Sequence, residues 1–591
     1  MQGWAALGVG LVAFAAYVFA ATPTPYPLDS AELATAAFGL GVAHPPGEET
    51  TLLFAKAFTL LPLGNAAFKV ALSQAAAGAA AAVLVFFLVL QTLHTVALVV
   101  ERTSLRTRTA VAAAAALAFA FAPGVVAVSD RAEVYAVQTA LSLAGLWLSL
   151  QARANRDARL AMLAALTIGL GVGNHSLVAG LVGAGAVVAA WPLLRASTAR
   201  GRFVLLAVLA LSAGLLVHAY LPLRTHAMFA AADSSPDSID NVLWGDARSL
   251  RGLWWLVSAH TFAEKATMVH SNATPWDLPF VFFEELGLVF ALLAPAGLYF
   301  LVRRSSSRLA GTAIAAAAAG SMLAALVGGL DPGNPDIRGY LGPAIALVAV
   351  LSASAVATGL GLLRSNKLRT LLAILFLAGA ASRFPSPSQY PGLRHASAAD
   401  GEVRSILADL PARSALFTSH FETGFLVGYQ SFVEGARPDM AWAHLAFAAG
   451  PGYAGRAALA HPELAGVLAK AAQQSGELIA ELGALDERRP VRLEPSAVLP
   501  SSVRRSLGPN GELWGLAKHP SPAAVSRVPS WILAEASNDR QVKAYLAWRN
   551  YIDAVWSCEL GLHERAAERF ANLERLVPRD ERFADLRAHC P

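Results

Sequence analysis

The sequence predicts a mainly α, polytopic membrane protein of about eleven spans, followed by a soluble C-terminal domain of mixed α/β to helical structure. Of 591 residues, 55% are hydrophobic and 15% are charged, whereas ordinary soluble chains carry about 25% charged residues. The apolar residues come in runs of about 20, the length that crosses a bilayer. These runs divide the chain into a membrane domain, residues 1–384, and a soluble domain, residues 385–591, with no further run of that length.

Eleven apolar runs in the first part of the chain predict membrane-spanning helices. Two of them, around Leu166 and Leu375, are short. The expected centres lie near Leu11, Val83, Leu117, Leu143, Leu166, Val182, Leu209, Val289, Ala317, Leu347 and Leu375.

The first run has an alternative interpretation as a cleaved signal peptide. Its opening residues, MQGWAALG, contain no Lys or Arg, whereas a signal peptide requires a basic segment before its apolar core. We therefore expect an uncleaved first span.

Alternate loops between the runs are basic, and this pattern predicts the orientation. ERTSLRTR, QARANRDAR, RASTARGR, RRSSSR and RSNKLR each contain three Lys or Arg and at most one acid. By the positive-inside rule these loops are cytoplasmic. The N-terminus is then cytoplasmic, and an odd number of spans places the soluble domain outside, in the periplasm of a bacterium. The net charge of +5 reflects these loops and does not indicate nucleic-acid binding.

The outer segments between the spans are two long loops, residues 21–68 and 223–280, and three short polar breaks, SDRAEVY, GNHS and DPGNPDIRG. In the soluble domain, SALFTSHFETGFLVGYQ alternates like strand and turn. Apolar spacing of three and four residues near 540–590 predicts a helical pair that resembles one tetratricopeptide-type repeat. A single such unit is expected to act as a helical cap. The two cysteines, Cys558 and Cys590, could pair in an oxidising compartment, but their spacing does not decide this.

Polar residues suited to a functional site collect at the outer ends of the spans. An ionisable group at membrane depth is costly and is a functional hypothesis by default. Their confinement to one end predicts one site at the outer surface, in contrast to an ion pathway through the bundle. The candidates are Asp29, Glu32, His44, Glu133, Asn174, His175, Arg224, Asp246, Asp336 and Arg338.

Asp29 and Glu32 are three residues apart and would share one helix face. One interpretation is a capping box, with Asp29 at the N-cap and Glu32 at the third helical position. The other is a general base, poised by partial desolvation at the membrane surface. The following residues, LATAAFGLGVA, are apolar enough to lie in the membrane interface.

Three further polar breaks have both structural and functional interpretations. His44 opens the rigid HPPG turn; its imidazole could merely flank the turn or donate a hydrogen bond to an anionic group. Glu133 in EVY, and Asn174 and His175 in GNHS, could cap helix ends or contribute to a substrate site.

Cations at the outer end require an anionic partner, since they oppose the positive-inside pattern. Arg224 in YLPLR suits a phosphate, because a guanidinium offers paired donors. Asp246 lies in the aromatic stretch NVLWGDARSLRGLWWLVS, in which Trp254 and Trp255 could form an interfacial belt or a sugar platform. Asp336 and Arg338 stand together in DIRGYLGP.

Two absences narrow the function. The chain has no G-x-x-x-x-G-K-[ST] loop and no H-E-x-x-H motif, which argues against a nucleotide-driven pump and a zinc protease. An outward-facing site in a bacterium has no supply of soluble nucleotide sugars. Activated sugar donors for such a site would be linked to lipid.

The order of these motifs resembles a known family. DSAELATAAFGLGVAHPPG, AEVYAVQ, GNHS, YLPLR, WGD and DIRGYLGP occur in the order typical of the domain of unknown function 2723 family, which includes protein O-mannosyltransferases of the transmembrane protein 260 type. The resemblance covers roughly residues 1–345 and extends to ARSALFTSHFETGFLVGYQSFVEGARPDM. Two stretches depart from the family pattern: Glu48 and Glu49 stand where Tyr-Pro is usual, and SHFETGF replaces an Asp-Asn-Asp motif.

The resemblance implies a GT-C type glycosyltransferase that takes a sugar, such as mannose, from a polyprenyl-phosphate donor. Asp29 and Glu32 match the acidic pair of the first outer loop, and His44 matches the His of HPPG. The implied mechanism has Asp29 accept the proton of an acceptor hydroxyl, a Ser or Thr of an exported protein, while Glu32 orients or shares this role. Arg224, Arg338 and His44 would stabilise the leaving phosphate. No metal is required, although paired carboxylates could hold one.

Two other functions fit the same residues. A lipid-linked-sugar transporter or a lipid-binding scaffold would use the cations without needing a base. A non-catalytic homologue would act through partner binding by the soluble domain.

Overall fold

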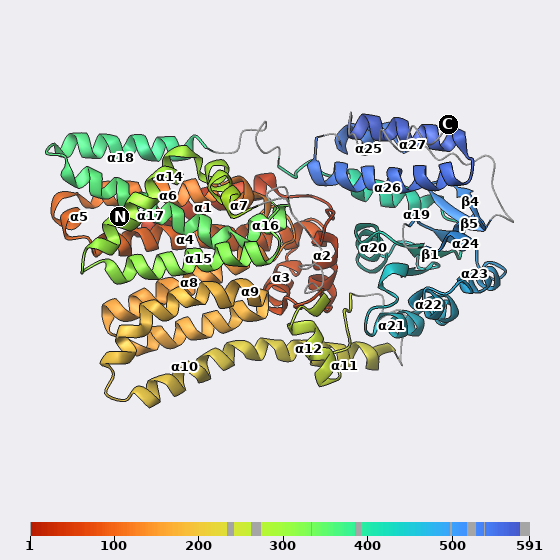
Figure 1. Ribbon diagram of the computed structural model, residues 1–591, viewed down its shortest axis with the longest axis horizontal. Coiled ribbons are helices and arrows are strands. Elements are labelled where there is room, and N and C mark those ends of the chain that lie inside the picture. Colours follow the sequence, from red (N-terminus) through yellow and green to blue (C-terminus); the bar gives the residue numbers. More distant parts are fainter. Residues whose placement is uncertain are drawn as a thin grey trace.

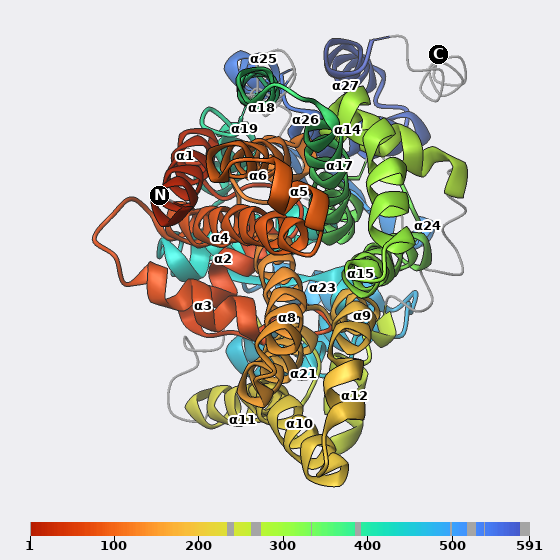
Figure 2. The ribbon, with the colours of Figure 1, turned by 90° about the vertical axis from the view of Figure 1, so that its left-hand side faces the viewer.

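A computed structural model describes residues 2–232, 242–261, 274–331, 334–383, 392–496, 499–516, 528–536 and 538–578. Long helices run side by side in one half of the molecule, and the C-terminal part with its small sheet forms the other (Figure 1). Short helices α2 and α3 lie between the halves. Figure 2 shows the bundle end-on. The predicted fold class, a mainly helical membrane protein with a mixed C-terminal part, is confirmed.

The bundle consists of long apolar helices. Seven membrane-length candidates are found among the described residues, judged by length and composition. Every predicted span centre lies in a helix, but those at Leu117, Leu143 and Leu375 lie in helices outside these seven candidates. The long helices are α1 (Gln2–Ala20), α4 (Ala66–His94), α6 (Leu105–Ala120), α8 (Tyr135–Asn155), α9 (Ala158–Ala196), α10 (Arg200–Leu215), α14 (Leu278–Arg303), α15 (Arg308–Val327), α17 (Gly342–Leu362) and α18 (Asn366–Ala381).

Helix α9 contains two of the predicted spans. His175 has φ −151° and ψ 93°, which are not helical values, so α9 is interrupted by a sharp kink at this residue. The two arms pack side by side, because a Cβ on Gly183 would lie 3.5 Å from Ile168 Cγ2 and one on Gly171 3.4 Å from Ala179 Cβ. The GNHS break is therefore the turn between two arms, as the sequence predicts.

The basic loops also set the starts of helices. Ser104 Oγ accepts from Thr107 N–H at 3.1 Å and caps α6, and Ser365 Oγ accepts from Leu368 N–H at 3.3 Å and caps α18. Asp157 caps α9 by accepting from Arg159 N–H at 2.8 Å. Such caps satisfy main-chain donors that a helix leaves unpaired at its first turn.

The basic loops gather at the end of the bundle away from the C-terminal part. A cavity of about 1480 Å³ there is lined by Gln2, Glu101, Arg153, Ser197 and Ser306, among other residues. The loop before α18 joins them, since Arg369 donates to the main chain of Arg102. Helices α2 and α3 lie at the opposite end (Figure 1).

Short helices connect the spans, and most of them build the end that faces the C-terminal part, whereas α5 lies with the basic loops at the other end (Figure 1). Residues 30–37 of α2 are all buried, and α2 packs on α3, α4 and the C-terminal helix α20. Protein thus covers most of the segment predicted to lie in the membrane interface, although Phe38 is exposed, and its place in the interface stays a prediction. These elements are α2 (Ser30–Gly39), α3 (Glu49–Thr59), α5 (Ala97–Arg102), α7 (Pro123–Ala127), η1 (Leu216–Ala219), α11 (Tyr220–Ala232), α12 (Leu250–Val257), η3 (Pro275–Asp277) and α16 (Pro335–Tyr340).

The C-terminal part contains a five-stranded sheet of order β2-β1-β3-β5-β4. Strand β1 is parallel to β2 and β3, whereas β5 is antiparallel to β3 and β4. The strands are β1 (Ala415–Thr418), β2 (Ala441–His444), β3 (Val491–Leu493), β4 (Leu507–Asn510) and β5 (Leu513–Leu516). The predicted boundary of the membrane domain at residue 384 lies outside the described residues.

Helices surround this sheet. The predicted strand-and-turn alternation ends at Thr418, because Phe421, Phe425 and Tyr429 recur at a helical spacing of four and residues 421–433 are helical. Helices α26 and α27 form the expected pair. The elements are α19 (Ala398–Asp409), α20 (Phe421–Gly428), η4 (Tyr429–Val433), η5 (Leu445–Phe447), α21 (Tyr453–Ala460), η6 (Pro462–Leu464), α22 (Ala465–Ala472), α23 (Leu478–Asp486), α24 (Ser501–Arg504), α25 (Ser530–Ala536), α26 (Arg540–Glu559) and α27 (His563–Leu576).

One apolar core continues from the first outer loop into the C-terminal part. It includes Leu33 of α2 and Val70 of α4 together with Leu426 of α20 and Leu546 of α26. The C-terminal part is therefore packed directly on the end of the bundle at which the candidate residues lie.

Candidate functional site

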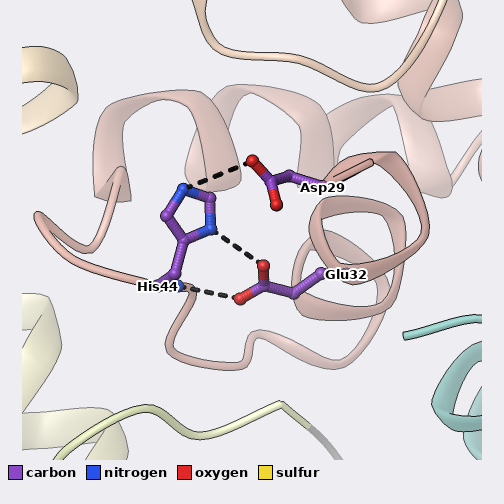
Figure 3. A group of neighbouring side chains, drawn as sticks. All are labelled: Asp29, Glu32 and His44. Atoms are coloured by element: carbon purple, nitrogen blue, oxygen red, sulfur yellow. Dashed lines mark hydrogen bonds and ion pairs between the residues drawn. The ribbon is translucent and has the colours of Figure 1, made fainter. Parts of the chain in front are cut away.

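At the start of the first outer loop, the side chains of Asp29 and Glu32 both face His44. Asp29 directly precedes α2, Glu32 lies in its first turn, and His44 follows in the HPPG turn. His44 Nδ1 lies 2.8 Å from Glu32 Oε2, and the His44 main-chain N–H donates to Glu32 Oε1 at 2.8 Å. His44 Nε2 lies 3.8 Å from Asp29 Oδ2 (Figure 3). The imidazole thus bridges the two acids that were predicted to share a helix face.

A fourth side chain completes this His44 centre, which we define as Asp29, Glu32, His44 and Glu48. Glu48 Oε1 lies 3.4 Å from His44 Nε2, and its side chain is 4% exposed. The sequence marks Glu48 only as a departure from the family pattern. Its position four residues after His44 is the signal that could have placed it here, since residues so spaced meet across a tight turn.

The capping-box interpretation of Asp29 and Glu32 is not realised. Asp29 occupies the N-cap position of α2, but its side chain accepts no hydrogen bond from the helix. Both Glu32 oxygens face His44 instead. Asp29 is 31% exposed at its side chain, whereas Glu32 is fully buried. Asp29 is therefore the acid that a substrate can reach, and Glu32 is the acid that orients His44.

The backbone around the centre adopts conformations that side chains rarely take. Leu28 and Glu48, which flank the segment, have φ values of 62° and 57°. The left-handed region costs an L-residue roughly 1–2 kcal/mol. The Leu28 N–H donates to Glu422 Oε1 at 2.9 Å, so the C-terminal part holds the residue before Asp29. Such strain persists only where surrounding contacts impose it.

A buried arginine lies next to this centre. Arg131 Nη2 lies 2.9 Å from Asp336 Oδ1 and 3.0 Å from Glu133 Oε1, and the side chains of Arg131 and Glu133 are 2% and 3% exposed. Glu133 and Asp336 were predicted as site residues, and the structure brings both to Arg131. Sequence reasoning missed Arg131, although it stands in the quoted outer break SDRAEVY.

Glu422 adds a carboxylate from the C-terminal part. Burial raises the pKa of Glu422 to about 8 despite its bond to Leu28 N–H, and the charges of Asp29 and Asp336 raise it further. Glu422 lies in the SHFETGF stretch that departs from the family pattern. Nothing in the local sequence connects it to residue 29, so only the fold reveals it.

The excess of carboxylates sets the protonation of the centre. Burial raises the pKa of Asp29 to about 7, with Asp336, Glu32 and Glu48 raising it further and His44 opposing them. Burial alone would lower the pKa of His44, but Glu48, Glu32 and Asp29 together raise it well above its usual value. At neutral pH His44 is therefore cationic, and Asp29 titrates in the range in which a general base works best.

The GNHS residues take structural positions close to the centre. Asn174 Oδ1 accepts from the N–H and hydroxyl of Thr51 at 3.1 and 2.5 Å, and its amide donates to Val134 O and Gln138 Oε1. Asn174 thus ties α9 to α3 and α8. His175 packs edge-on against Tyr340, with ring centroids 4.7 Å apart, and lies 5.7 Å from the Tyr135 ring.

The structure does not place Arg224 beside Asp29. Arg224 Nε donates to Leu40 O at 2.7 Å and Nη2 to Gly39 O at 3.2 Å, so the guanidinium satisfies carbonyls at the C-terminal end of α2. Asp29 stands at the other end of this helix, and ten helical residues span about 15 Å. The prediction that Arg224 converges with the acids is therefore wrong: in the described part of the chain its guanidinium binds carbonyls at the far end of α2.

Arg338 is paired with other acids. Its Nη1 lies 2.8 Å from Glu285 Oε1 and its Nη2 2.7 Å from Glu284 Oε2, both on α14. Glu285 also accepts from Gly124 N–H at 2.8 Å. The predicted Arg338 thus links α16, α14 and α7.

Asp246 forms an ion pair with Arg248 at 2.7 Å, and both side chains are about a third exposed. Its neighbour Trp244 reaches the centre instead. Residues 42 and 243 form a parallel bridge, and the Trp244 and His44 rings lie edge to face with centroids 6.3 Å apart. The WGD motif was rightly singled out, but its aromatic residue, which sequence reasoning did not select, is the one that contacts His44.

Asp29, Glu32 and His44 are also close enough to hold a metal ion, since one potential ligand atom from each lies within 4.8 Å of the others. A metal requires a neutral imidazole. Metal binding would displace the proton of His44, whereas in the metal-free centre the imidazolium supplies the positive charge.

Comparison with known proteins agrees with the motif order. Residues 29–195 match the family model described as Protein O-mannosyl-transferase TMEM260 N-terminal domain. The resemblance inferred from the motifs is confirmed over this segment. Protein O-mannosyl-transferase TMEM260 of Mus musculus is 30% identical over 237 residues, which cover 38% of this chain and 29% of the mouse protein. The matched segment is thus less than a third of that relative.

Two solved structures are loosely similar. One is ArnT from Cupriavidus metallidurans bound to undecaprenyl phosphate, with 16% identity, 73% of this chain and 85% of that chain covered, and a TM-score of 0.47. The other is an oligosaccharyltransferase from Archaeoglobus fulgidus in complex with Zn and sulfate, with 12% identity, 85% and 71% coverage, and a TM-score of 0.42. At these TM-scores the likeness does not identify the residues of a site.

Proposed function

We propose that this protein is a membrane glycosyltransferase of GT-C type. It transfers a sugar, a hexose such as mannose, from a polyprenyl-phosphate donor to a Ser or Thr hydroxyl of an exported protein. The observation that carries this proposal is Asp29, a reachable carboxylate whose pKa is raised to about 7, placed beside a cationic His44. The matched TMEM260 N-terminal domain over residues 29–195 contains both residues and supports the same reaction.

In this mechanism Asp29 accepts the proton of the acceptor hydroxyl. The hydroxyl oxygen attacks the anomeric carbon, and the bond from that carbon to the phosphate oxygen breaks, so that the polyprenyl phosphate leaves with the electron pair. Direct displacement inverts the anomeric centre. His44, held by Glu32 at 2.8 Å, is the cation nearest Asp29 and stabilises negative charge that develops on the leaving phosphate.

The proposed orientation places the His44 centre outside the bacterial plasma membrane. The basic loops lie at the opposite end of the bundle, which the positive-inside rule assigns to the cytoplasm. Cys558 lies in α26, and its pairing with Cys590 in an oxidising compartment stays an expectation from the sequence. Cys590 lies outside the described residues.

Reconstitution tests the function directly. The full chain in lipid nanodiscs would be mixed with polyprenyl-phosphate mannose and a peptide rich in Ser and Thr, and the products analysed by mass spectrometry. We expect one hexose added to the peptide. Failure with every polyprenyl-phosphate sugar and hydroxyl acceptor would reject the proposal. Exported proteins from a strain lacking the chain would identify the natural sugar and acceptor.

The pH profile of transfer is a second expectation. Because the ionised form of Asp29 is the base, kcat/KM should rise as pH increases through about 7. Removing the charge of Glu48 with Glu48→Gln should shift this rise to lower pH, since Glu48 raises the Asp29 pKa. His44→Gln removes the cation that lowers it and should shift the rise to higher pH. Shifts in the same direction for both variants would contradict the assignment of the base.

Chelation tests the expectation that no metal is needed. The proposed steps use only Asp29 and the imidazolium of His44, so we expect transfer by nanodisc-embedded protein to persist after EDTA treatment. The measurement is the initial rate before chelation, after chelation, and after adding back Mg²⁺ or Mn²⁺. Loss on chelation with recovery on either ion would instead assign Asp29, Glu32 and His44 as metal ligands.

A transporter of lipid-linked sugar is the second candidate. The cavity of about 1480 Å³ at the basic end of the bundle is the observation that favours it, since a carrier requires access from that side. Transport needs no base, so full activity of Asp29→Asn in a lipid-flipping assay, without transfer by the unmodified chain, would support the transporter.

A further inference from the structure

A second group of polar side chains lies at one edge of the sheet in the C-terminal part. In parallel sheets, the carboxyl ends of the strands are the usual place for ligands. Strands β1, β2 and β3 end side by side, with Thr418 opposite His444 and Phe417 opposite Leu493. Ser419 and His420 follow β1 directly. We call Thr418, Ser419, His420 and His444 the sheet-edge group.

The sheet-edge group has polar atoms that nothing in the described chain satisfies. His444 is 2% exposed, and among the described residues neither ring nitrogen has a hydrogen-bond partner of full geometry, although a main-chain group of His420 lies close enough to raise its pKa against burial. Thr418 Oγ1 and Ser419 Oγ are likewise without a partner there, and His420 Nδ1 has only Glu422 Oε2 at 3.5 Å. Buried polar atoms nearly always have a hydrogen-bond partner in native proteins. Several buried polar atoms without one in the same place therefore indicate a ligand site.

The orphans are not a consequence of loose packing. Glu494, at the end of β3, accepts from the N–H groups of Ser419 and His420 at 2.8 and 2.9 Å and from Thr423 Oγ1 at 2.6 Å. The loop after β1 is therefore held firmly. Gly424 of α20 lies directly against His444: a Cβ there would lie 2.5 Å from His444 Cδ2, so the imidazole packs closely on the helix at this glycine.

The sheet-edge group lies next to the His44 centre. His420 Nδ1 is 3.5 Å from Glu422 Oε2, and Glu422 Oε1 accepts from the N–H of Leu28, the residue before Asp29. A second connection runs through aromatic rings. The His444 ring stacks on Phe447 with centroids 3.8 Å apart, and the Phe447 and Trp244 centroids are 4.8 Å apart. The Trp244 ring in turn contacts His44. A ligand at the sheet edge would therefore extend toward Asp29.

The chemistry of the group selects an uncharged ligand. Burial lowers the pKa of both His420 and His444 to about 4, so both imidazoles are neutral and offer one donor and one acceptor each. Glu422 is protonated at neutral pH, and the charge of Glu494 is paired with Arg549 at 3.1 Å, so the group offers no cation of its own to a phosphate. Hydroxyls and neutral imidazoles beside aromatic rings match the N–H, C=O and hydroxyl groups of a polypeptide.

We propose that the sheet-edge group is the acceptor subsite, which binds a neutral polypeptide segment and presents its hydroxyl to Asp29. This inference rests on the proposed function and assigns its substrate side. The lipid-borne donor reaches Asp29 from the bundle, and the acceptor reaches it from the sheet. His444 and Ser419 are then specificity-determining residues of the transferase.

The test uses His444→Phe, which keeps the stacking on Phe447 and removes both ring nitrogens. In nanodisc-embedded full chain we expect the KM for an uncharged Ser/Thr peptide to rise about tenfold, the loss expected for roughly 1.4 kcal/mol of binding. The KM for the donor and the Tm should stay unchanged, because the nitrogens have no hydrogen-bond partner of full geometry to lose within the described chain. Ser419→Ala should give a smaller rise, and His563→Phe, at the exposed start of α27, should give none.

Binding without donor separates this inference from the proposed function. Fluorescence anisotropy of a labelled peptide on the nanodisc-embedded chain should show weaker binding for His444→Phe even if no transfer occurs, and that result would leave the subsite standing while rejecting the transferase. Normal transfer with an unchanged peptide KM in His444→Phe and Ser419→Ala would overturn the subsite. A variant that alters only the KM of a glycan acceptor would overturn the polypeptide assignment.

Discussion

Asp29→Asn is expected to reduce sugar transfer by about 10²–10⁴-fold, the contribution typical of a positioned general base. Asparagine has nearly the same shape as aspartate but cannot accept the hydroxyl proton. The Asp29 side chain makes no capping bond to α2, so the loss should not come from unfolding of that helix. The measurement is kcat/KM for peptide glycosylation in nanodiscs, with Tm recorded for each variant.

Asp157→Asn is the matched control for this prediction. Asp157 caps α9 at the basic end of the bundle, and asparagine caps helices equally well, so neither stability nor transfer should change. Glu32→Gln should lose less activity than Asp29→Asn, because the buried Glu32 orients His44 and does not meet substrate. Activity of Asp29→Asn within about tenfold of the unmodified chain would remove Asp29 as the base.

Arg131→Met is expected to cause the largest loss of stability, about 3–5 kcal/mol of unfolding free energy, the usual result of leaving buried charges unpaired. Methionine fills a similar volume but cannot pair with the carboxylates of Glu133 and Asp336, which lie 3.0 and 2.9 Å from Arg131 Nη2. Thermal unfolding in detergent, followed by tryptophan fluorescence, measures the effect as a fall in Tm.

The pH dependence distinguishes lost charge pairing from lost packing. Burial already raises the pKa of Glu133 against the lowering effect of Arg131, and removing Arg131 raises it further. A carboxyl whose pKa is higher in the folded than in the unfolded protein stabilises the fold while it is protonated. That stability is lost as pH rises through the pKa of the carboxyl in the folded protein. The fall in Tm should therefore be large at about pH 8 and smaller at about pH 5.5.

Arg248→Met serves as the control for Arg131→Met. Arg248 pairs with Asp246 at 2.7 Å, but both side chains are about a third exposed. Exposed ion pairs contribute about 0–1 kcal/mol. A fall in Tm for Arg131→Met that equals that of Arg248→Met, or that does not vary with pH, would show that Arg131 does not hold the two acids together.

Local signals account for part of the candidate site. Asp29, Glu32 and His44 lie within sixteen residues of one another, and a helix followed by a rigid turn brings them together. Glu133 and Asp336 were selected because ionisable groups at membrane depth are costly, and both lie beside Arg131. Arg131 was missed, although the argument used for Arg224, that a cation in an outer loop opposes the positive-inside pattern, applies to it equally.

Two of the predictions depended on how distant elements pack. Arg224 was expected to face the acids, but an arginine can equally satisfy helix-end carbonyls, and this choice depends on how α11 approaches α2. The stretch at residues 33–43 was expected at the membrane interface because its composition is apolar. That composition is equally suited to burial under α20, and only the position of the C-terminal part distinguishes the two.

The sequence by itself determined that the chain is a helical membrane protein, where its long apolar helices lie, and that candidate polar residues stand at their outer ends. Each span satisfies its own backbone hydrogen bonds, so these properties depend only on nearby residues. Tertiary structure alone decided that Glu422, 394 residues beyond Leu28, reaches the first outer loop and that Trp244 contacts His44. The physical reason is that side-chain contacts between distant segments follow from how whole elements pack, and no local pattern encodes that packing.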